Sequence, residues 1–342
     1  TDVKVPGMLV ASIERCPVFG GKVKSFDASR ALKQPGVKQV VEVPSGVAVV
    51  ATDTWSAFSG RDFLKVEWDL GPAANLDSAA IRAQFEERLK GPGKAVRAEG
   101  DAAKGLEGAA KKLEATYEAP FLAHATMEPM VAVADVKADR CTIWAPSQGP
   151  GWSMAGITAI TGLKPEQVEV NVPLLGGGFG RRAMGDFMLD AVACSKAVGA
   201  PVKVQWTRPD DMRHDGYRPA TLHHLEGGLD ASGKAVAWRH RFAGPSIAQA
   251  NKFPWPPEAA ETSGAADLAY AIPNLEVQWA QADTPVPLWF WRAVAASFNP
   301  FATECFLDEL AQAAGKDPLA FRLELMHAGP TKVGHDTVDP KR

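Results

Sequence analysis

The chain contains 342 residues, of which 46% are hydrophobic and 23% are charged, and its formal net charge is -3 at pH 7. This small charge excludes a strong electrostatic attraction to nucleic acid or to an anionic membrane. No run of 18 apolar residues occurs, so the sequence predicts no membrane-spanning helix. The composition is that of an ordinary globular protein with enough length for two domains and a large core.

Both ends of the chain resemble cut ends. Thr1 is not an initiator residue, and nothing like a signal peptide precedes the first predicted strand. The tail from His335 to Arg342 shows no closing element. We therefore expect a piece of a longer protein whose true N-terminus is absent, which leaves its compartment open.

Four cysteines are spread along the chain without any C-x-x-C pair. Their spacing excludes an iron–sulfur cradle and a zinc site, and it implies no disulfide framework. Buried free thiols are expected instead. The four residues are Cys16, Cys141, Cys194 and Cys305.

The first hundred residues alternate between strand and helix patterns and predict a mixed β-α-β-β-α-β unit. Its predicted elements are strand Gly7–Arg15, helix Asp27–Lys33, strands Val37–Val43 and Gly46–Thr52, helix Trp55–Leu64 and strand Leu64–Asp69. A helix from Asn75 to Leu89, a linker over residues 90–93 and an exposed helix from Ala98 to Lys112 are expected to follow. We place a domain boundary near residue 95, between a first domain at 1–95 and a second at 96–342.

The second region mixes strands and helices with irregular segments. Its predicted strands are Lys112–Ala119, Met130–Val136, Arg140–Ala145, Val168–Leu175, Val202–Thr207, Thr221–Leu229 and Ala235–Phe242, and its predicted helices are Trp152–Thr161, Met184–Val198, Asn299–Gly315 and Pro318–Met326. Residues 208–214 are predicted to form a loop, and residues 253–287 an irregular covering segment. His223 and His224 are neighbours on a strand and point to opposite faces, so they are not expected to share a metal.

The sequence Gly176-Gly177-Gly178-Phe179-Gly180-Arg181-Arg182 lies between a strand pattern and a helix pattern. Four glycines in five positions allow positive φ and let a ligand approach the main-chain N–H groups. The two arginines at the start of the helix favour an anion. A tight turn that binds nothing is the alternative. Gln148 follows the end of another predicted strand, and adjacent strand ends of one sheet would bring it to these glycines.

One chemical interpretation of this turn is dinucleotide binding. Gly178-x-Gly180-x-x-Ala183 satisfies G-x-G-x-x-A between a strand and a helix. The next strand carries no acidic residue for a ribose and ends before Arg208, which would suit an NADP 2′-phosphate. However, no second βαβ half follows the pattern.

A second interpretation rests on several motifs together. The segment His124–Pro129, the strand end at Gln148, the glycine turn, and Arg292 followed by Glu304-Cys305 resemble the large subunit of the xanthine oxidase family of molybdenum hydroxylases. The motifs and their spacing most resemble those of the isoquinoline 1-oxidoreductase β-subunit and aldehyde oxidase types. The resemblance runs from Met8 to Met326. It implies an α+β fold, in which an α/β hammerhead domain precedes part of a molybdenum-cofactor-binding domain.

The resemblance also implies roles for particular residues. The Gln148 amide and the main-chain N–H of Phe179 would donate toward the apical oxygen on molybdenum, whose charge fixed donors stabilise. Gly177, Gly178 and Gly180 would let the backbone approach the pterin. Arg292, with Ala293 beside it, would lie near the substrate and polarise it, and both residues would also help to bind the cofactor.

Other residues are expected to be structural. His124, Met127 and Glu128 would form a buried turn beneath the site, and Trp289 and Trp291 are expected in the core. Xanthine-type members carry a lysine and a glutamate where Arg182 and Ala183 stand here. The resemblance therefore favours an aldehyde or an N-heteroaromatic substrate over a purine.

The resemblance implies partners as well. The family's catalytic base is a glutamate in a Gly-x-Gly-Glu context, and this chain lacks that motif. The chain alone is therefore expected to be inactive and to need the rest of its subunit. Electrons leaving molybdenum need a separate small iron–sulfur subunit, because this chain has no cluster ligands. Whether the pterin carries a cytosine nucleotide stays open. The compartment stays open as well, with the bacterial cytoplasm and the periplasm as the two candidates. A cofactor-free fragment that serves as an assembly surface is the remaining alternative.

Overall fold

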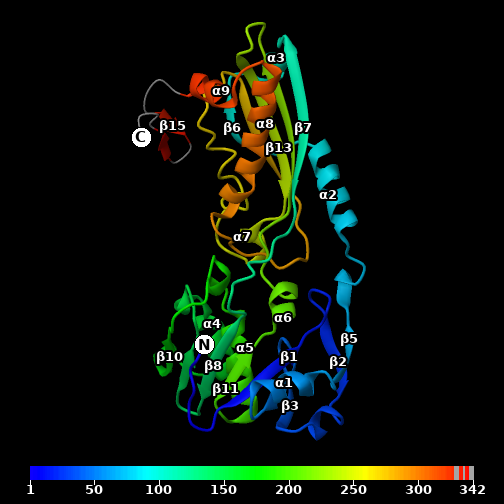
Figure 1. Cartoon of the computed structure of the whole chain (residues 1–342), viewed down its shortest axis with the longest axis vertical. Coiled ribbons are helices and arrows are strands. Elements are labelled where there is room, and N and C mark those ends of the chain that lie inside the picture. The colour runs from blue at the N-terminus through cyan, green and yellow to red at the C-terminus, as the bar shows by residue number, and fades with distance from the viewer. Residues whose placement is uncertain (327–330, 334–335, 339–342) are drawn as a thin grey trace. The chain divides into compact units, whose positions relative to one another are not determined.

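The computed structural model describes residues 1–326, 331–333 and 336–338, which fall into two compact units (Figure 1). The first unit comprises Thr1–Asn75, Ala123–Tyr217 and Pro285–Trp291, and the second comprises Leu76–Leu122, Arg218–Thr284 and the chain from Arg292 onward. The chain therefore passes between the units several times. The predicted domain boundary near residue 95 stays a prediction.

The first unit contains strands, α-helices and single-turn 3-10 helices. The strands are β1 Leu9–Glu14, β2 Lys22–Asp27, β3 Val37–Val43, β4 Gly46–Ala51, β5 Lys65–Asp69, β8 Val131–Val136, β9 Cys141–Trp144, β10 Val168–Asn171 and β11 Val202–Gln205. The α-helices are α1 Thr54–Arg61, α4 Met154–Thr161, α5 Asp186–Val198 and α6 Arg208–Arg213. The 3-10 helices are η1 Ala31–Lys33, η2 Gly71–Ala73, η3 Pro150–Ser153, η4 Pro165–Gln167 and η5 Arg181–Ala183.

Seven strands of this unit form one mixed sheet in the order β10-β9-β8-β11-β1-β4-β3, and β2 pairs with β5 in a separate ribbon. Neighbouring residues on β1 point to opposite faces. Val10 packs with Ala57 of α1, and Ala11 belongs to the larger core that contains Phe187 and Val192 of α5. Helices therefore cover both faces of the sheet, and most of its core lies on the α5 side.

Strands β9 and β10 run parallel and adjacent at one end of the sheet, with Trp144 opposite Asn171 in the register. The carboxyl ends of adjacent parallel strands lie at the same sheet edge. The expectation that the strand before Gln148 and the strand before the glycines are neighbours is confirmed.

The second unit is built on a five-stranded sheet of order β6-β14-β13-β12-β7. Its strands are β6 Lys94–Glu99, β7 Lys111–Ala119, β12 Thr221–Leu229, β13 Ala235–Gly244 and β14 Leu275–Gln281, beside the short pair β15 Thr331–Val333 and β16 Asp336–Val338. Its helices are α2 Ser78–Lys90, α3 Ala102–Glu107, α7 Ile247–Ala250, η6 Val294–Ser297, α8 Asn299–Ala313 and α9 Pro318–Leu325.

The two faces of this second sheet are covered by different helices. A Cβ on Gly227 would meet Leu310 and Phe306 of α8, whereas a Cβ on the adjacent Gly228 would meet Ala109, just after α3. The core between the sheet and α8 contains Trp238, Phe242, Phe306 and Leu310, all fully buried. The mixed α+β architecture that the sequence predicts is confirmed.

Several local predictions are wrong. The predicted linker leads directly into the edge strand β6, whose Lys, Arg and Glu residues hide its pattern and protect an exposed edge. The predicted exposed helix is limited to α3. The 253–287 segment contains β14, whose alternating Leu275, Val277 and Trp279 are buried.

Two further corrections lie next to the glycine turn. The strand predicted up to Leu175 ends at Asn171. The loop predicted after Thr207 is helix α6, because Thr207 caps the main-chain N–H of Asp210 while Asp210 bonds back to Thr207. That capping box, with proline in the first turn, is a sequence signal that the loop prediction missed.

All four cysteines are free, and Cys16, Cys141 and Cys194 are buried as predicted. Cys305 is only partly buried, because it lies on α8 away from the core side.

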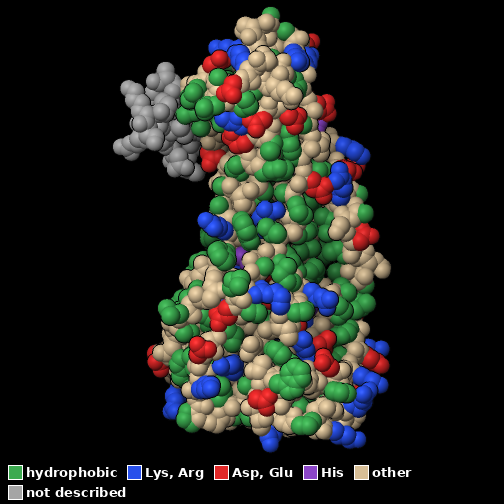
Figure 2. All heavy atoms as spheres, in the orientation of Figure 1, with side chains coloured by type: hydrophobic (Ala, Val, Ile, Leu, Met, Phe, Trp, Pro, Cys, Tyr) green, Lys and Arg blue, Asp and Glu red, His purple; other side chains and the backbone are tan. Residues whose placement is uncertain are grey.

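Among the described residues, no helix is long and apolar enough to cross a membrane. Figure 2 shows Lys and Arg interspersed with Asp and Glu over the visible face, in keeping with the small net charge. The tail prediction for residues 335–342 lies largely outside the described residues.

His223 and His224 point to opposite faces of β12, as predicted. His223 is fully buried and its Nδ1 lies 3.0 Å from Nε2 of the equally buried His240, while its Nε2 lies 2.7 Å from the hydroxyl of Thr221. Burial lowers the pKa of His223 to about 3, and burial also lowers the pKa of His240, with the neighbouring His223 adding to the effect. The pair is therefore neutral in the folded protein.

This neutral pair predicts acid-sensitive stability. Unfolding returns the pKa of His223 to about 6.5, so the unfolded state binds more protons below that pH and the stabilisation present above pH 6.5 is lost as the pH falls. Between pH 7 and about 4.5, each such histidine should cost about 2 to 3 kcal/mol of unfolding free energy. Urea unfolding at both pH values measures this loss. A His223→Gln/His240→Gln double variant should show a shallower pH dependence, and the control His224→Gln should not; equal slopes would contradict the account.

Candidate functional site

The glycine turn adopts backbone conformations that ordinary residues avoid. Gly177 and Gly180 have φ values of 97° and 102°, and Phe179 between them has φ 54° although it is not a glycine. A non-glycine residue in the left-handed region carries strain of order 1 kcal/mol or more and is commonly found at functional sites. The turn is therefore held in place by its surroundings.

Three carbonyl oxygens of the turn are bonded to the protein interior. Gly176 O accepts from the main-chain N–H of Glu128 at 3.0 Å, and Gly178 O accepts from the N–H of Arg181 at 2.9 Å. Gly177 O accepts from Nε of Arg182 at 2.7 Å. In a trans peptide the N–H points opposite to the C=O. The N–H groups of Gly177, Gly178 and Phe179 therefore face away from these partners, and none of them donates to an acceptor among the described residues.

Gln148 stands beside these amides. Its Oε1 accepts from the main-chain N–H of Gly180 at 2.9 Å, and its own N–H donates to Arg182 O at 3.0 Å. A Cβ on Gly178 would lie 2.5 Å from Oε1 of Gln148, so this contact requires glycine. Because the oxygen is used inside the turn, the exposed Nε2 amide is left to donate outward. Gln148, Gly177, Gly178, Phe179 and Gly180 are thus brought together as one set of donors.

The prediction that Arg181 and Arg182 attract an anion is wrong. Both side chains are fully buried and paired with acidic residues. Arg181 forms two 2.8 Å bonds with Asp186 and a 2.7 Å ion pair with Asp215. Burial lowers the pKa of the Arg181 guanidinium, but the attraction of Asp186 and Asp215 outweighs burial and raises it. These arginines hold the turn from below.

Arg182 is fixed from the other side by the His124–Pro129 segment. It donates to Glu128 O and to Glu128 Oε2, each at 2.8 Å. Burial lowers the pKa of Arg182 against the opposing attraction of Glu128. The structural role predicted for Glu128 fits this contact. Met127, in contrast, is 87% exposed and does not belong to a buried turn.

His124 is buried, as predicted, and both of its ring nitrogens have partners. Nδ1 lies 3.1 Å from Oδ2 of Asp215, and Nε2 lies 2.9 Å from the main-chain oxygen of Phe290. A Cβ on Gly180 would lie 1.8 Å from that same Phe290 oxygen. Asp215 and Phe290 are site-supporting residues that the sequence interpretation missed, since no local pattern marks a buried aspartate or a main-chain carbonyl.

The tryptophans behave differently from each other. Trp289 is buried, as predicted, and its indole N–H donates to Gly180 O at 3.1 Å. Trp291 is only half-buried, so its assignment to the core is wrong in part. Trp152, which is 63% exposed, packs edge-on against Trp289 with ring centroids 6.1 Å apart. Aromatic rings therefore border the turn.

Arg292 and Ala293 belong to the second unit, whereas Gln148 and the glycine turn belong to the first. Both residues are exposed. Ala293 and Val294 have φ values of 63° and 49°. A β-branched residue at positive φ is an outlier, which makes this turn a strained segment. The structure thus groups the predicted site residues into two separate sets.

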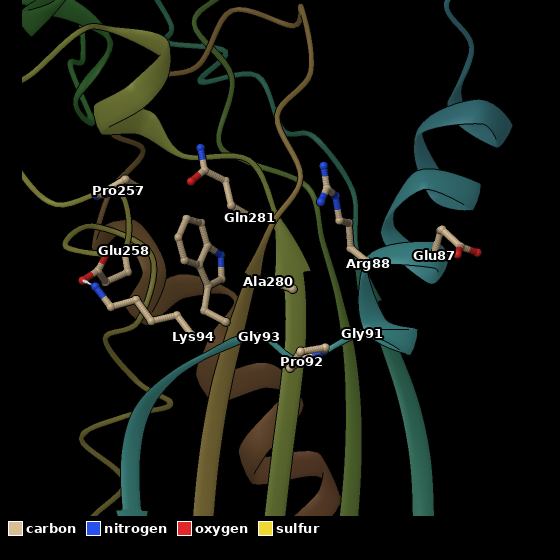
Figure 3. Close-up of a pocket in the computed structure, with 11 residues that line it drawn as sticks. Glu87, Arg88, Gly91, Pro92, Gly93, Lys94, Pro257, Glu258, Ala280 and Gln281 are labelled. Carbon is tan, nitrogen blue, oxygen red and sulfur yellow. Dashed lines mark hydrogen bonds and ion pairs between the residues drawn. The ribbon is translucent and has the colours of Figure 1, made fainter.

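A hollow of about 660 Å³ lies within the second unit between α2, the start of β6 and the end of β14 (Figure 3). Two of the charged residues that line this hollow, Lys94 and Glu258, form an ion pair with each other, and Glu87 pairs with Lys90 beside it. Gln281 donates to Asp283. The glycine turn is the better candidate site, because its amides have no acceptor among the described residues.

The topology does not match a dinucleotide-binding unit. In such a unit the strand before the glycines pairs with the strand that follows the helix. Here β10 pairs with β9, whereas β11, which follows α5, pairs with β8 and β1. Moreover, α5 begins at Asp186 rather than at the glycines. The comparisons below give no support to this alternative or to a cofactor-free assembly surface.

A family model described as the molybdopterin cofactor-binding domain matches residues 87–326. The isoquinoline 1-oxidoreductase subunit beta of Brevundimonas diminuta is 29% identical over 351 residues, covering 96% of this chain and 44% of that protein. The aldehyde oxidoreductase molybdenum-binding subunit of Escherichia coli is 33% identical over 237 residues, covering 68% of this chain and 30% of that protein.

Solved structures resemble this fold as well. Quinoline 2-oxidoreductase from Pseudomonas putida 86 superimposes with a TM-score of 0.76 at 19% identity, covering 99% of this chain and 49% of that chain. Aldehyde oxidoreductase from Desulfovibrio gigas gives a TM-score of 0.74 at 20% identity, covering 98% and 41% of the two chains. The chain thus spans less than half the length of these relatives.

The packing around the turn predicts a large difference between two glycine substitutions. Gly180→Ala combines a φ of 102° with a Cβ placed 1.8 Å from Phe290 O, so it should destabilise the protein by about 2 to 5 kcal/mol. Gly151→Ala is the matched control, since a Cβ there meets nothing within 4 Å. Thermal unfolding of both variants checks the prediction. Equal midpoints would show that the turn is not packed as described.

Proposed function

This chain belongs to the molybdopterin cofactor-binding domain family, in the molybdenum-binding subunits of the xanthine oxidase type, and we propose that its glycine turn helps to hold a molybdenum–molybdopterin cofactor. The whole enzyme would be an oxidoreductase that hydroxylates an aldehyde or an N-heteroaromatic carbon. When bound, the cofactor supplies the two-electron chemistry that places water-derived oxygen on carbon.

The residues present fit this group. A metal-bound terminal oxygen and the oxygens of a pterin phosphate accept hydrogen bonds, and the turn offers consecutive N–H groups at Gly177, Gly178 and Phe179 that have no acceptor among the described residues. Successive main-chain N–H groups of this kind form concave anion-binding sites. The absence of a Cβ at Gly178, 2.5 Å from Oε1 of Gln148, keeps the cradle open.

Within the proposal, Gln148 and Phe179 do the electrostatic work. The main-chain N–H of Gly180 donates to Oε1 of Gln148 at 2.9 Å and so fixes the side-chain amide. Nε2 of Gln148 is therefore oriented before any ligand binds. Phe179 offers its main-chain N–H from a strained conformation fixed by the neighbouring bonds. Such preorganised donors stabilise charge without reorganising during the reaction. Gly177, Gly178 and Gly180 admit the cofactor to the backbone.

Arg292 and Ala293 are proposed to act on the substrate side. A guanidinium can polarise a carbonyl or a ring nitrogen and stabilise developing negative charge. The exposure of Arg292 and the strained backbone at Ala293 and Val294 support a functional segment. Arg292 is therefore proposed to act on the substrate, and contact of Arg292 and Ala293 with the cofactor stays part of the proposal.

The proposed substrate is an aldehyde or an N-heterocycle. Two observations support this choice: relatives are named for isoquinoline and for aldehyde, and the position after Arg181 holds Arg182, which is buried and paired with Glu128. A buried, paired arginine is not available to a purine. The pterin is proposed to be molybdopterin itself or its cytosine dinucleotide, which pterin analysis distinguishes.

The proposed partners are the remaining part of the same subunit and a small iron–sulfur subunit. This chain covers 44% and 49% of two of the relatives that it matches. The glutamate that serves as the family's catalytic base lies in a Gly-x-Gly-Glu context, which is absent from this sequence. Dispersed cysteines cannot hold an iron–sulfur cluster. The chain alone is therefore proposed to be inactive.

The observation that carries the proposal is the row of amides beside Gln148 that have no acceptor in the described part of the chain. Cofactor content tests the proposal. The full-length protein should contain molybdenum and pterin in near-equal amounts to polypeptide, measured by metal analysis and pterin release. In Gly178→Ala the new Cβ would displace the exposed Gln148 side chain, which can move into solvent, so the stability of the protein should change little. Molybdenum content should fall roughly tenfold, as the loss of one or two charge-assisted hydrogen bonds to the cofactor predicts.

Gly151→Ala again serves as the control and should retain full metal content. A full-length protein that purifies without molybdenum and pterin would contradict the proposed function. Equal metal content in the Gly178→Ala and Gly151→Ala variants would remove the turn from the site while leaving the family assignment intact.

A further inference from the structure

His124 lies at the junction between the glycine turn and the segment that leads to Arg292. Its side chain is fully buried, and each ring nitrogen faces a group that accepts hydrogen bonds. On one side is the carboxylate of Asp215, 3.1 Å from Nδ1; on the other is the main-chain oxygen of Phe290, 2.9 Å from Nε2. A neutral imidazole has one N–H and can satisfy only one of them.

From this geometry we infer that His124 is a doubly protonated imidazolium that clamps the glycine turn to the Trp289–Phe290 segment. As an imidazolium it donates from Nδ1 to Asp215 and from Nε2 to Phe290 O. Both bonds are then charge-assisted and therefore stronger than neutral ones. With a neutral ring, one buried acceptor would face a lone pair of the imidazole.

The surrounding charges favour this state. Asp215 and Asp186 are two carboxylates that share the single guanidinium of Arg181, through contacts of 2.7 Å and 2.8 Å. The nearby Asp211 is already paired with Arg208 at 2.5 Å. A positive His124 supplies a second cation, so these four side chains together carry no net charge. Three of them are buried, where an unpaired charge is costly, and Asp186 is 29% exposed.

A proton on Asp215 would be the other way to complete the His124 contact. That proton would remove the charge from a carboxyl group that accepts from the Arg181 guanidinium and from the main-chain N–H of His124. A neutral carboxyl group would make both of these hydrogen bonds weaker than the charge-assisted bonds of a carboxylate. The proton therefore belongs on the imidazole.

The clamp acts on the site through Phe290 and Gly180. A Cβ on Gly180 would lie 1.8 Å from Phe290 O and 3.4 Å from Nε2 of His124, so the end of the turn rests against this bond. The indole of Trp289 fixes Gly180 O as well. His124 is thus a positioning residue for the Phe179 N–H, a consequence that rests on the proposed function, whereas its protonation does not.

Neutron diffraction from deuterium-exchanged crystals of the full-length protein tests the protonation directly. We expect deuterons on both Nδ1 and Nε2 of His124 and none on Asp215. A deuteron on only one ring nitrogen, or one on the Asp215 carboxyl, would overturn the inference. The result does not depend on molybdenum, so a protein that lacks the metal refutes the proposed function and still decides the state of His124.

The positioning role needs a second measurement. His124→Gln keeps a side-chain NH2 donor but loses the charge, and the control is His224→Gln, at a partly exposed histidine in the second unit. We expect molybdenum content about tenfold lower in His124→Gln and an altered electron paramagnetic resonance spectrum of molybdenum in the fraction that remains loaded. A merely structural role would lower the yield without changing that spectrum. An unchanged spectrum would therefore overturn the positioning role.

Discussion

The site depends on one constraint, which is that the carbonyl groups of the glycine turn are bonded inward. Glu128 N, Arg182 Nε and Arg181 N hold the oxygens of Gly176, Gly177 and Gly178 at 3.0, 2.7 and 2.9 Å. Because each peptide is rigid and trans, fixing its oxygen also fixes the direction of its N–H. Three amides are thereby directed outward, two of them through main-chain bonds and one through the Arg182 side chain.

Buried charge is the means by which the chain maintains this arrangement. Arg181 and Arg182 are fully buried beneath the turn, which is costly unless every charge has a partner. Asp186, Asp215 and Glu128 provide those partners from separate segments of the chain. Removing Glu128 would take away the carboxylate that pairs with Arg182, and removing Asp215 would take one of two carboxylates from Arg181, so the turn is coupled to residues far away in sequence.

The sequence could predict the parts of this site that depend on local chemistry. Alternating and β-branched runs predicted strands at β9 and β10, and the glycines between a strand and a helix indicated the turn. The resemblance to the molybdenum hydroxylase family pointed to Gln148 and Phe179. The pairing of β9 with β10 followed from these positions and is confirmed.

What the sequence could not predict depends on tertiary partners. Adjacent arginines after a turn look like an anion site, and only the fold shows that Asp215 and Glu128 neutralise them. The edge strand β6 was missed because its charged residues suit an exposed edge as well as a linker. The roles of Gln148, Phe179 and Arg292 remain proposals, since they concern a ligand rather than the fold.

A crystal structure of the cofactor-loaded full-length protein tests the central claim most directly. The account predicts that Nε2 of Gln148 and the main-chain N of Phe179 both lie about 3 Å from an oxygen of the molybdenum cofactor. A cofactor bound elsewhere, with these two nitrogens bonded only to water, would contradict it.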